Sequence, residues 1–224
     1  MEKKLKEKIF FKKYKIKNLI CKGQFSSVYE GINILTNKSI AMKFEPRISK
    51  FNLLESELFH LIKVEGIGIP KVIIFGRNHL YNILIEELLG PSMKQLFNLN
   101  KNIKQKTLLK TICMLVIQSL DRLQVIHSKN YIHNNIKPGS LLIGKKDKNI
   151  IYLVDFGLSS KYRSNKTGKH IRYKFINKVS GSNAFMSLNS NGGYQSSRRD
   201  DLESLGYTLI YLAKFIYLGE IMIL

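Results

Sequence analysis

Residues 131–157, with the sequence YIHNNIKPGSLLIGKKDKNIIYLVDFG, place the strongest constraint on the fold. An apolar start leads into a polar loop, and two short apolar runs, LLI and IIYLV, follow it. Two such runs separated by polar residues predict a β-hairpin. Asp155, Phe156 and Gly157 come directly after the second run. The segment therefore predicts a loop, a hairpin and an acidic side chain presented at the end of a strand.

The spacing of these residues resembles the catalytic loop of protein kinases, in which H-R-D is followed after four residues by N and later by D-F-G. His133 and Asp155 fit this pattern. Asn135 stands at the position of the catalytic aspartate, and Ser140 stands at the position of the metal-binding asparagine. The resemblance implies a kinase whose chemistry has been altered.

Composition limits the other classes of protein. With 44% hydrophobic residues in 224, the chain can bury a core, which excludes wholesale disorder. Cys21 and Cys113 form no CxxC pattern, so no disulfide framework or zinc site is implied and a reducing compartment is favoured. The formal charge of +21 has two interpretations: nonspecific anion binding through a basic surface, or a coding bias toward lysine without any partner.

The two ends of the chain bear on location. The lysine-rich start contains no secretory signal peptide, so we expect a cytoplasmic or nuclear protein. Residues 205–224 are strongly apolar and about long enough to span a bilayer. Lys214 and Glu220 interrupt this segment, which favours a buried helix over a membrane anchor.

The pattern of the first half predicts a small lobe after a basic tail at 1–13. Residues 51–64 have the apolar period of an amphipathic helix, and glycines and a proline end it. Around this helix the sequence predicts five short strands, at 14–20, 25–32, 38–45, 72–75 and 81–86. Residues 14–87 are therefore expected to form an antiparallel lobe with one helix, of the α+β class.

Residues 88–224 are expected to form a second, mainly helical lobe. Helical patterns cover 107–129 and 197–217, and a polar segment rich in Gly, Ser and Asn separates them. The chain stops soon after the second pattern, so we expect a partial lobe that leaves apolar surface exposed.

From Tyr14 onward the chain resembles the casein kinase 1 family of protein Ser/Thr kinases. The motifs occur in the family order and are AMKFEP (41–46), GIP (68–70), LLGPS (88–92), IKP (136–138), DFG (155–157), HI.Y (170–173), SG (180–181), MS.N (186–189) and SRRDDLE (197–203). The resemblance implies one bilobal kinase domain that uses ATP and Mg²⁺ to phosphorylate protein Ser/Thr, with the larger lobe truncated after the SRRDDLE helix.

The resemblance also assigns roles. Lys43 is expected to hold the nucleotide phosphates, with Glu55 as its carboxylate partner and Glu57 as a nearby alternative register. Lys137 is expected to approach the transferring phosphate, and Asp155 to bind Mg²⁺. Adenine is expected between apolar side chains and the backbone of the hinge, at Ile20, Val28, Ala41, Leu142, Glu87 and Leu89.

The sequence departs from the family in its catalytic groups. An asparagine amide at 135 cannot take a proton from a substrate hydroxyl at neutral pH. General-base catalysis contributes about 10²–10⁴-fold to rate. Ser140 supplies a shorter and weaker metal ligand than asparagine. These two changes predict impaired or absent catalysis.

The nucleotide pocket departs from the family as well. Only Gly23 remains of the three glycines in the phosphate-binding turn, because Cys21 and Ser26 replace the others. Glu86 occupies the gatekeeper position, where a buried carboxylate needs a partner or a proton. Ala184 replaces an arginine that recognises acidic or phosphorylated substrates. Nucleotide binding is therefore expected to be retained but weakened.

These features favour a pseudokinase, an interaction module that keeps the kinase scaffold and a protein partner or substrate. A weakly active Ser/Thr kinase and a truncated duplicate without function remain as alternatives. A specific nucleic-acid binder is a fourth hypothesis, but no recognition motif and no interleaving of aromatic and basic residues support it.

Overall fold

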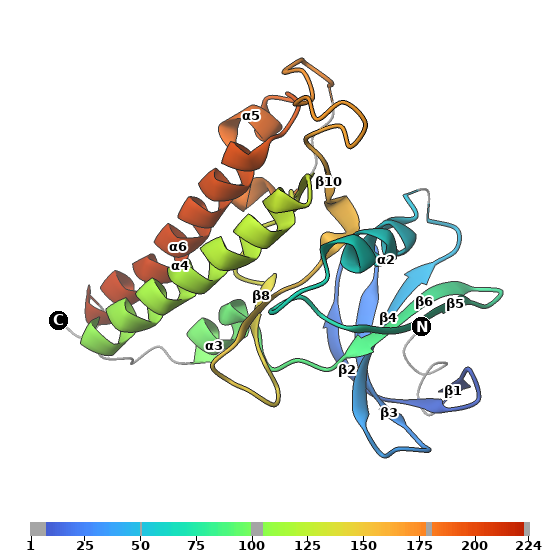
Figure 1. The fold of residues 1–224 in the computed structure, drawn as a ribbon. Helices are drawn as coiled ribbons and strands as arrows, with labels where there is room; N and C mark the ends of the chain where they lie inside the picture. Colours follow the sequence, from blue (N-terminus) through green and yellow to red (C-terminus); the bar gives the residue numbers. More distant parts are fainter. Residues whose placement is uncertain (1–7, 50, 100–104, 178–180, 222–224) are drawn as a thin grey trace.

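The protein, represented here by a computed structural model, is described over residues 8–49, 51–99, 105–177 and 181–221. A curled sheet forms the smaller lobe, and two long helices dominate the larger one (Figure 1). The helix α2 (Leu53–Val64) lies between the sheet and the larger lobe. The predicted bilobal α+β fold is confirmed.

The smaller lobe is a single antiparallel sheet in the order β1-β2-β3-β4-β6-β5. Its strands are β1 (Ile9–Phe10), β2 (Tyr14–Lys22), β3 (Ser27–Asn33), β4 (Ser39–Pro46), β5 (Val72–Arg77) and β6 (Tyr81–Glu87). It therefore has six strands, one more than the sequence predicted.

The additional strand, β1, lies in the segment that was expected to be a tail. The loop between β1 and β2 has three residues, 11–13, and in it Phe11 and Lys12 have positive φ, at 48° and 59°. The N–H of Lys13 closes this turn by donating to the carbonyl of Phe10 at 3.1 Å. Phe10 is buried in the core of the sheet. The ring of Phe11 packs where a Cβ on Gly76 of β5 would stand, so this glycine admits the hairpin.

Alternation along β4 sends neighbouring side chains to opposite faces of the sheet. Met42 and Phe44 are fully buried in a core formed by the sheet alone. Lys43, between them, points to the other face, toward α2 and the larger lobe. A polar side chain is therefore held rigidly between two buried apolar anchors.

The larger lobe is built on α4 (Gln105–Ser128) and α6 (Arg198–Ile221), which pack side by side (Figure 1). Its remaining elements are α3 (Met93–Leu99), β7 (Tyr131–Ile132), β8 (Leu141–Ile143), β9 (Ile151–Leu153), η1 (Phe156–Leu158), β10 (Ser160–Lys161), η2 (Asn183–Phe185) and α5 (Leu188–Asn191). The predicted hairpin is present as β8–β9, and Asp155 follows it.

Large apolar side chains remain exposed on both long helices. Leu109 and Ile117 of α4 are each 62% exposed, and Ile210 of α6 is 66% exposed. Among the described residues, no helix is both long and apolar enough to cross a membrane. Residues 222–224 of the apolar C-terminal segment lie outside the described part of the chain.

Candidate active site

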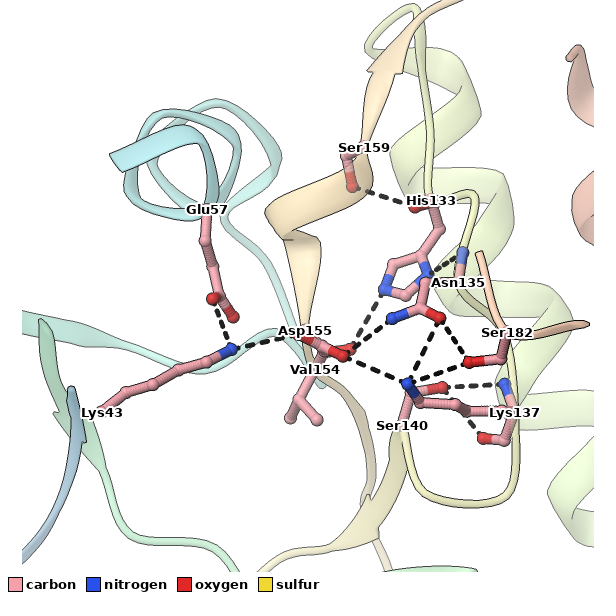
Figure 2. Close-up of polar contacts among 10 residues, drawn as sticks. All are labelled: Lys43, Glu57, His133, Asn135, Lys137, Ser140, Val154, Asp155, Ser159 and Ser182. Atoms are coloured by element: carbon pink, nitrogen blue, oxygen red, sulfur yellow. Dashed lines mark hydrogen bonds and ion pairs between the residues drawn. The ribbon is translucent and has the colours of Figure 1, made fainter. Parts of the chain in front are cut away.

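Lys43 contacts one carboxylate from each lobe. Its ammonium donates hydrogen bonds to Glu57 Oε2 at 2.5 Å and to Asp155 Oδ1 at 3.0 Å (Figure 2). Burial disfavours the charged ammonium, but Asp155 and Glu57 outweigh it and raise the pKa of Lys43 above its ordinary value. Lys43 is therefore a fixed positive charge at the junction of the lobes.

The partner of Lys43 on α2 is Glu57, and the expectation of Glu55 is wrong. Glu55 pairs instead with Arg77 at 2.6 Å, and both side chains are about half exposed. Glu57 is 3% exposed. Residues two apart on a helix do not share a face, so only one of the two glutamates can face Lys43.

Asp155 lies in the left-handed region, with φ 75° and ψ 58°, at the start of η1. Its Oδ2 accepts a hydrogen bond from the amide Nδ2 of Asn135 at 2.7 Å and lies 3.4 Å from Lys137 Nζ (Figure 2). The charge of Lys43, and then that of Lys137, hold the pKa of Asp155 well below its usual range despite burial. Both carboxylate oxygens thus have protein partners.

Ser140 does not join this group. Its side chain is fully buried, and its Oγ accepts from the backbone N–H of Lys137 at 3.0 Å and donates to the carbonyl of Lys137 at 2.9 Å. The hydroxyl therefore closes the turn of its own loop instead of facing Asp155, as Figure 2 shows.

Ser182 is a member of the site that the sequence analysis missed. Its Oγ donates to Asn135 Oδ1 at 3.1 Å and accepts from Lys137 Nζ at 3.2 Å. Lys137 Nζ also donates to Asn135 Oδ1 at 3.3 Å. No motif marked Ser182, although it comes directly after the SG pair at 180–181, which was assigned from the family pattern.

The loop that carries Asn135 is held from beneath by α6. The carboxylate of Asp201 accepts from the backbone N–H groups of His133 and Asn134, both at 2.8 Å. His133 is buried, which lowers its pKa; its Nε2 donates to the carbonyl of Val154, and its Nδ1 accepts from the N–H of Asn135. The second aspartate of the SRRDDLE motif thus fixes the position of Asn135.

The glycine turn lies over the same cleft. The N–H of Gly23 donates to the carbonyl of Ser26 at 2.8 Å, which closes the turn between β2 and β3. One cleft between the lobes is lined by Gly23, Lys43, Asn135, Lys137 and Asp155. The structure therefore brings together the residues expected at the phosphates, except Glu55 and Ser140.

The residues expected around adenine lie on several elements. In the smaller lobe, β2 carries Ile20, β3 carries Val28 and β4 carries Ala41. In the larger lobe, β8 carries Leu142. Between the lobes, Glu87 ends β6 and Leu89 follows it. The backbone N–H of Glu87 donates to the carbonyl of Lys71 at 3.0 Å. Their role at adenine stays a prediction.

Glu86 on β6 has a buried carboxyl oxygen that lacks a partner in the described part of the chain. Its Oε2 is buried and has no hydrogen-bond partner among the described residues. Burial, with the negative charge of Glu57, raises the pKa of Glu86 to about 8. The carboxyl group of Glu86 is thus largely protonated at neutral pH, because burial disfavours its charged form.

A bilobal fold with a glycine turn, a strand lysine paired to a helix carboxylate, and an aspartate after a β-hairpin defines the protein-kinase class. The family described as the protein kinase domain matches residues 14–218. Casein kinase I homolog 2 of Schizosaccharomyces pombe is 40% identical over 205 residues, which cover 90% of this chain and 46% of that protein. The chain belongs to the casein kinase 1 family of protein kinases.

The chain spans less than half the length of this relative. Kinases generally bind ATP with Mg²⁺. In this cleft the residues do not fit a bound Mg²⁺ well. Asp155 is the single carboxylate at the expected metal position, Asn135 donates to it, and Ser140 faces away. Among the described residues, no group of three or more His, Cys, Asp or Glu side chains could hold a metal ion.

Proposed function

We propose that this domain binds ATP in the cleft between its lobes and transfers phosphate poorly or not at all. The Lys43–Glu57 pair supports nucleotide binding, because it holds an ammonium extended into the cleft at the depth of Asp155. A lysine ammonium is a common ligand for nucleotide phosphates. The remaining glycine of the turn, Gly23, supports close approach of the backbone.

The contact from Asn135 to Asp155 is the observation that carries the second half of the proposal. At 2.7 Å, the Nδ2 group of Asn135 donates to Asp155, so the remaining amide oxygen accepts from Lys137 and Ser182. An amide oxygen does not take a proton from a hydroxyl at neutral pH. Loss of a general base lowers the rate by about 10²–10⁴-fold.

Transfer of labelled γ-phosphate to casein tests this function. We expect wild type to be at the background set by Asp155→Ala, and Asn135→Asp/Ser140→Asn to rise above it. Wild-type transfer above Asp155→Ala but below Asn135→Asp/Ser140→Asn would show a weak kinase, and wild-type transfer as fast as that of Asn135→Asp/Ser140→Asn would refute the impairment. Absence of ATP binding, measured by calorimetry on the same samples, would refute the nucleotide-binding half.

We propose that in the cell this domain binds a protein partner or a protein substrate, in the cytoplasm or nucleus. The kinase class supports a protein ligand, since kinases of this class act on proteins. The basic composition supports nonspecific binding of anions, which would weaken steeply as salt rises.

A further inference from the structure

We propose that the cleft binds the phosphates of ATP without a divalent cation, because the chain's own side chains take the place of the metal. This inference rests on the proposed nucleotide binding and concerns how the phosphates are held. It is carried by the partners of Asp155, the orientation of Ser140 and the balance of charge in the cleft.

The first observation is that both carboxylate oxygens of Asp155 accept hydrogen bonds from protein side chains. Lys43 donates to Oδ1 at 3.0 Å, and Asn135 donates to Oδ2 at 2.7 Å, with Lys137 3.4 Å from the same oxygen. A divalent cation would have to displace the Asn135 amide and compete with two ammonium groups. Hydrogen bonds to a charged acceptor are the strong ones, so each displacement is costly.

The second observation is that Ser140 is withdrawn from the cleft. Its hydroxyl uses its donor and an acceptor position on the backbone of Lys137, and the side chain is fully buried. Rotating it toward Asp155 would break both bonds and leave the backbone N–H of Lys137 without the hydroxyl that accepts from it. In the family pattern the asparagine at this position is a metal ligand, and Ser140 does not offer its hydroxyl to a metal ion in the cleft.

The third observation is the balance of charge. Within the cleft, the ammonium groups of Lys43 and Lys137 oppose the carboxylates of Glu57 and Asp155. An aspartate at 135 would add a further negative charge within hydrogen-bond distance of Asp155. Two carboxylates at that distance repel each other and, with phosphates, demand a cation between them. Asparagine removes that demand.

The same side chains supply what the metal would give to the phosphates. The side chain of Lys137 is 29% exposed, and its Nζ contacts Ser182 Oγ at 3.2 Å, Asn135 Oδ1 at 3.3 Å and Asp155 Oδ2 at 3.4 Å. A phosphate oxygen would take the place of the longest of these contacts, the one to Asp155. Lys43 adds a second ammonium deeper in the cleft. We infer that Lys137, positioned by Asn135 and Ser182, and Lys43, positioned by Glu57, bind the phosphate oxygens directly.

The experiment is calorimetric titration of ATP into the full 224-residue chain, once in EDTA and once in excess MgCl₂. We compare wild type with Asn135→Asp/Ser140→Asn, which restores the family's ligands. Asn183→Asp is the matched control, because it adds the same charge on an exposed residue of η2 beside Ser182. Melting temperatures without nucleotide establish that each variant is folded.

We expect the dissociation constant of wild type and of the control to differ by less than about threefold between EDTA and MgCl₂, a small step on the free-energy scale of binding. In Asn135→Asp/Ser140→Asn, we expect affinity in EDTA to fall at least about tenfold below that in MgCl₂. Wild-type binding that needs MgCl₂ would overturn this inference and leave the proposed function standing. No binding in either buffer would overturn both.

A second readout is independent of ATP affinity. The electron paramagnetic resonance signal of free Mn²⁺, titrated with protein alone, decreases when the ion is bound. We expect no decrease with wild type and a decrease with Asn135→Asp/Ser140→Asn. Binding of Mn²⁺ by wild type that Asp155→Ala abolishes would contradict the inference.

Discussion

The carboxylate of Glu45 accepts a hydrogen bond from the backbone N–H of Leu53 at 2.8 Å, so a strand residue caps the helix that carries Glu57. The second oxygen accepts from Asn82 at 3.2 Å and lies 3.4 Å from the N–H of Leu54. The residue before the helix, Asn52, makes no capping bond of its own. Since Glu45 and Lys43 lie on the same face of β4, one strand fixes both the helix and its ion-pair partner.

Glu45→Ala should therefore destabilise the domain. Glu45 is 1% exposed, and its loss leaves the N–H of Leu53 without its partner and removes a negative charge from a helix N-terminus. We expect the free energy of unfolding, measured in urea, to fall by about 1–3 kcal/mol. Glu30→Ala is a control on a partly exposed strand carboxylate, and an equal loss there would contradict a specific capping role.

Glu57→Gln should weaken ATP binding where Glu55→Gln does not. Glu57 holds Lys43 from a buried position, whereas Glu55 pairs with Arg77 at the surface. Breaking the buried pair should cost about 3 kcal/mol of stability, and the surface pair less than about 1 kcal/mol. Urea unfolding and calorimetry with ATP on the two variants measure both effects. Equal effects of the two substitutions would contradict the assignment of Glu57, and not Glu55, as the partner of Lys43.

Glu86 should make stability depend on pH. Its folded pKa of about 8 lies above the model-peptide value of 4.5, so the folded state keeps a proton that the unfolded state has released. Stability from this group is complete below about pH 4.5 and is lost as pH rises toward 8 and beyond.

Glu86→Leu should remove that dependence. We expect the variant to gain about 1–3 kcal/mol over wild type at pH 9, where the wild-type carboxyl is ionised and unpaired, and less at pH 5. Thermal unfolding at the two pH values measures the difference. Glu86→Gln keeps the shape without the charge, and a gain that is the same at both pH values would contradict titration of Glu86.

Asp201→Asn should loosen the loop that carries Asn135. The carboxylate of Asp201 accepts from two backbone N–H groups and pairs with His127 at 2.8 Å, with 1% of the side chain exposed. Hydrogen bonds to a charged group contribute about 1.5–3 kcal/mol, so we expect a loss of that order in urea unfolding. Asp121→Asn, on the exposed face of α4, should change stability by less than about 0.5 kcal/mol. Amide hydrogen exchange at His133 and Asn134 should quicken only in Asp201→Asn.

The β1 hairpin shows why part of the smaller lobe was not predictable. Its strand is two residues long and lies among lysines, so neither alternation nor composition marks it. It forms because Phe10 packs into the core of the sheet and Phe11 packs against Gly76 on β5, where no side chain is in the way. Both contacts join residues far apart in the sequence, and a local pattern carries no information about them.

The sequence determined by itself the family, the α+β fold and the identity of the groups in the cleft, because Lys43, Asn135, Lys137 and Asp155 lie at fixed short spacings from local turns and strands. Tertiary structure decided which groups meet. Glu57, and not Glu55, pairs with Lys43, because Glu45 on β4 caps α2 and sets the register of this helix. The hydroxyl of Ser140 bonds to the backbone of its own loop, and Ser182, which is distant in the sequence, bonds to Asn135 in the site. Hydrogen-bond partners depend on distances across the fold, and these are set only when the two lobes pack together.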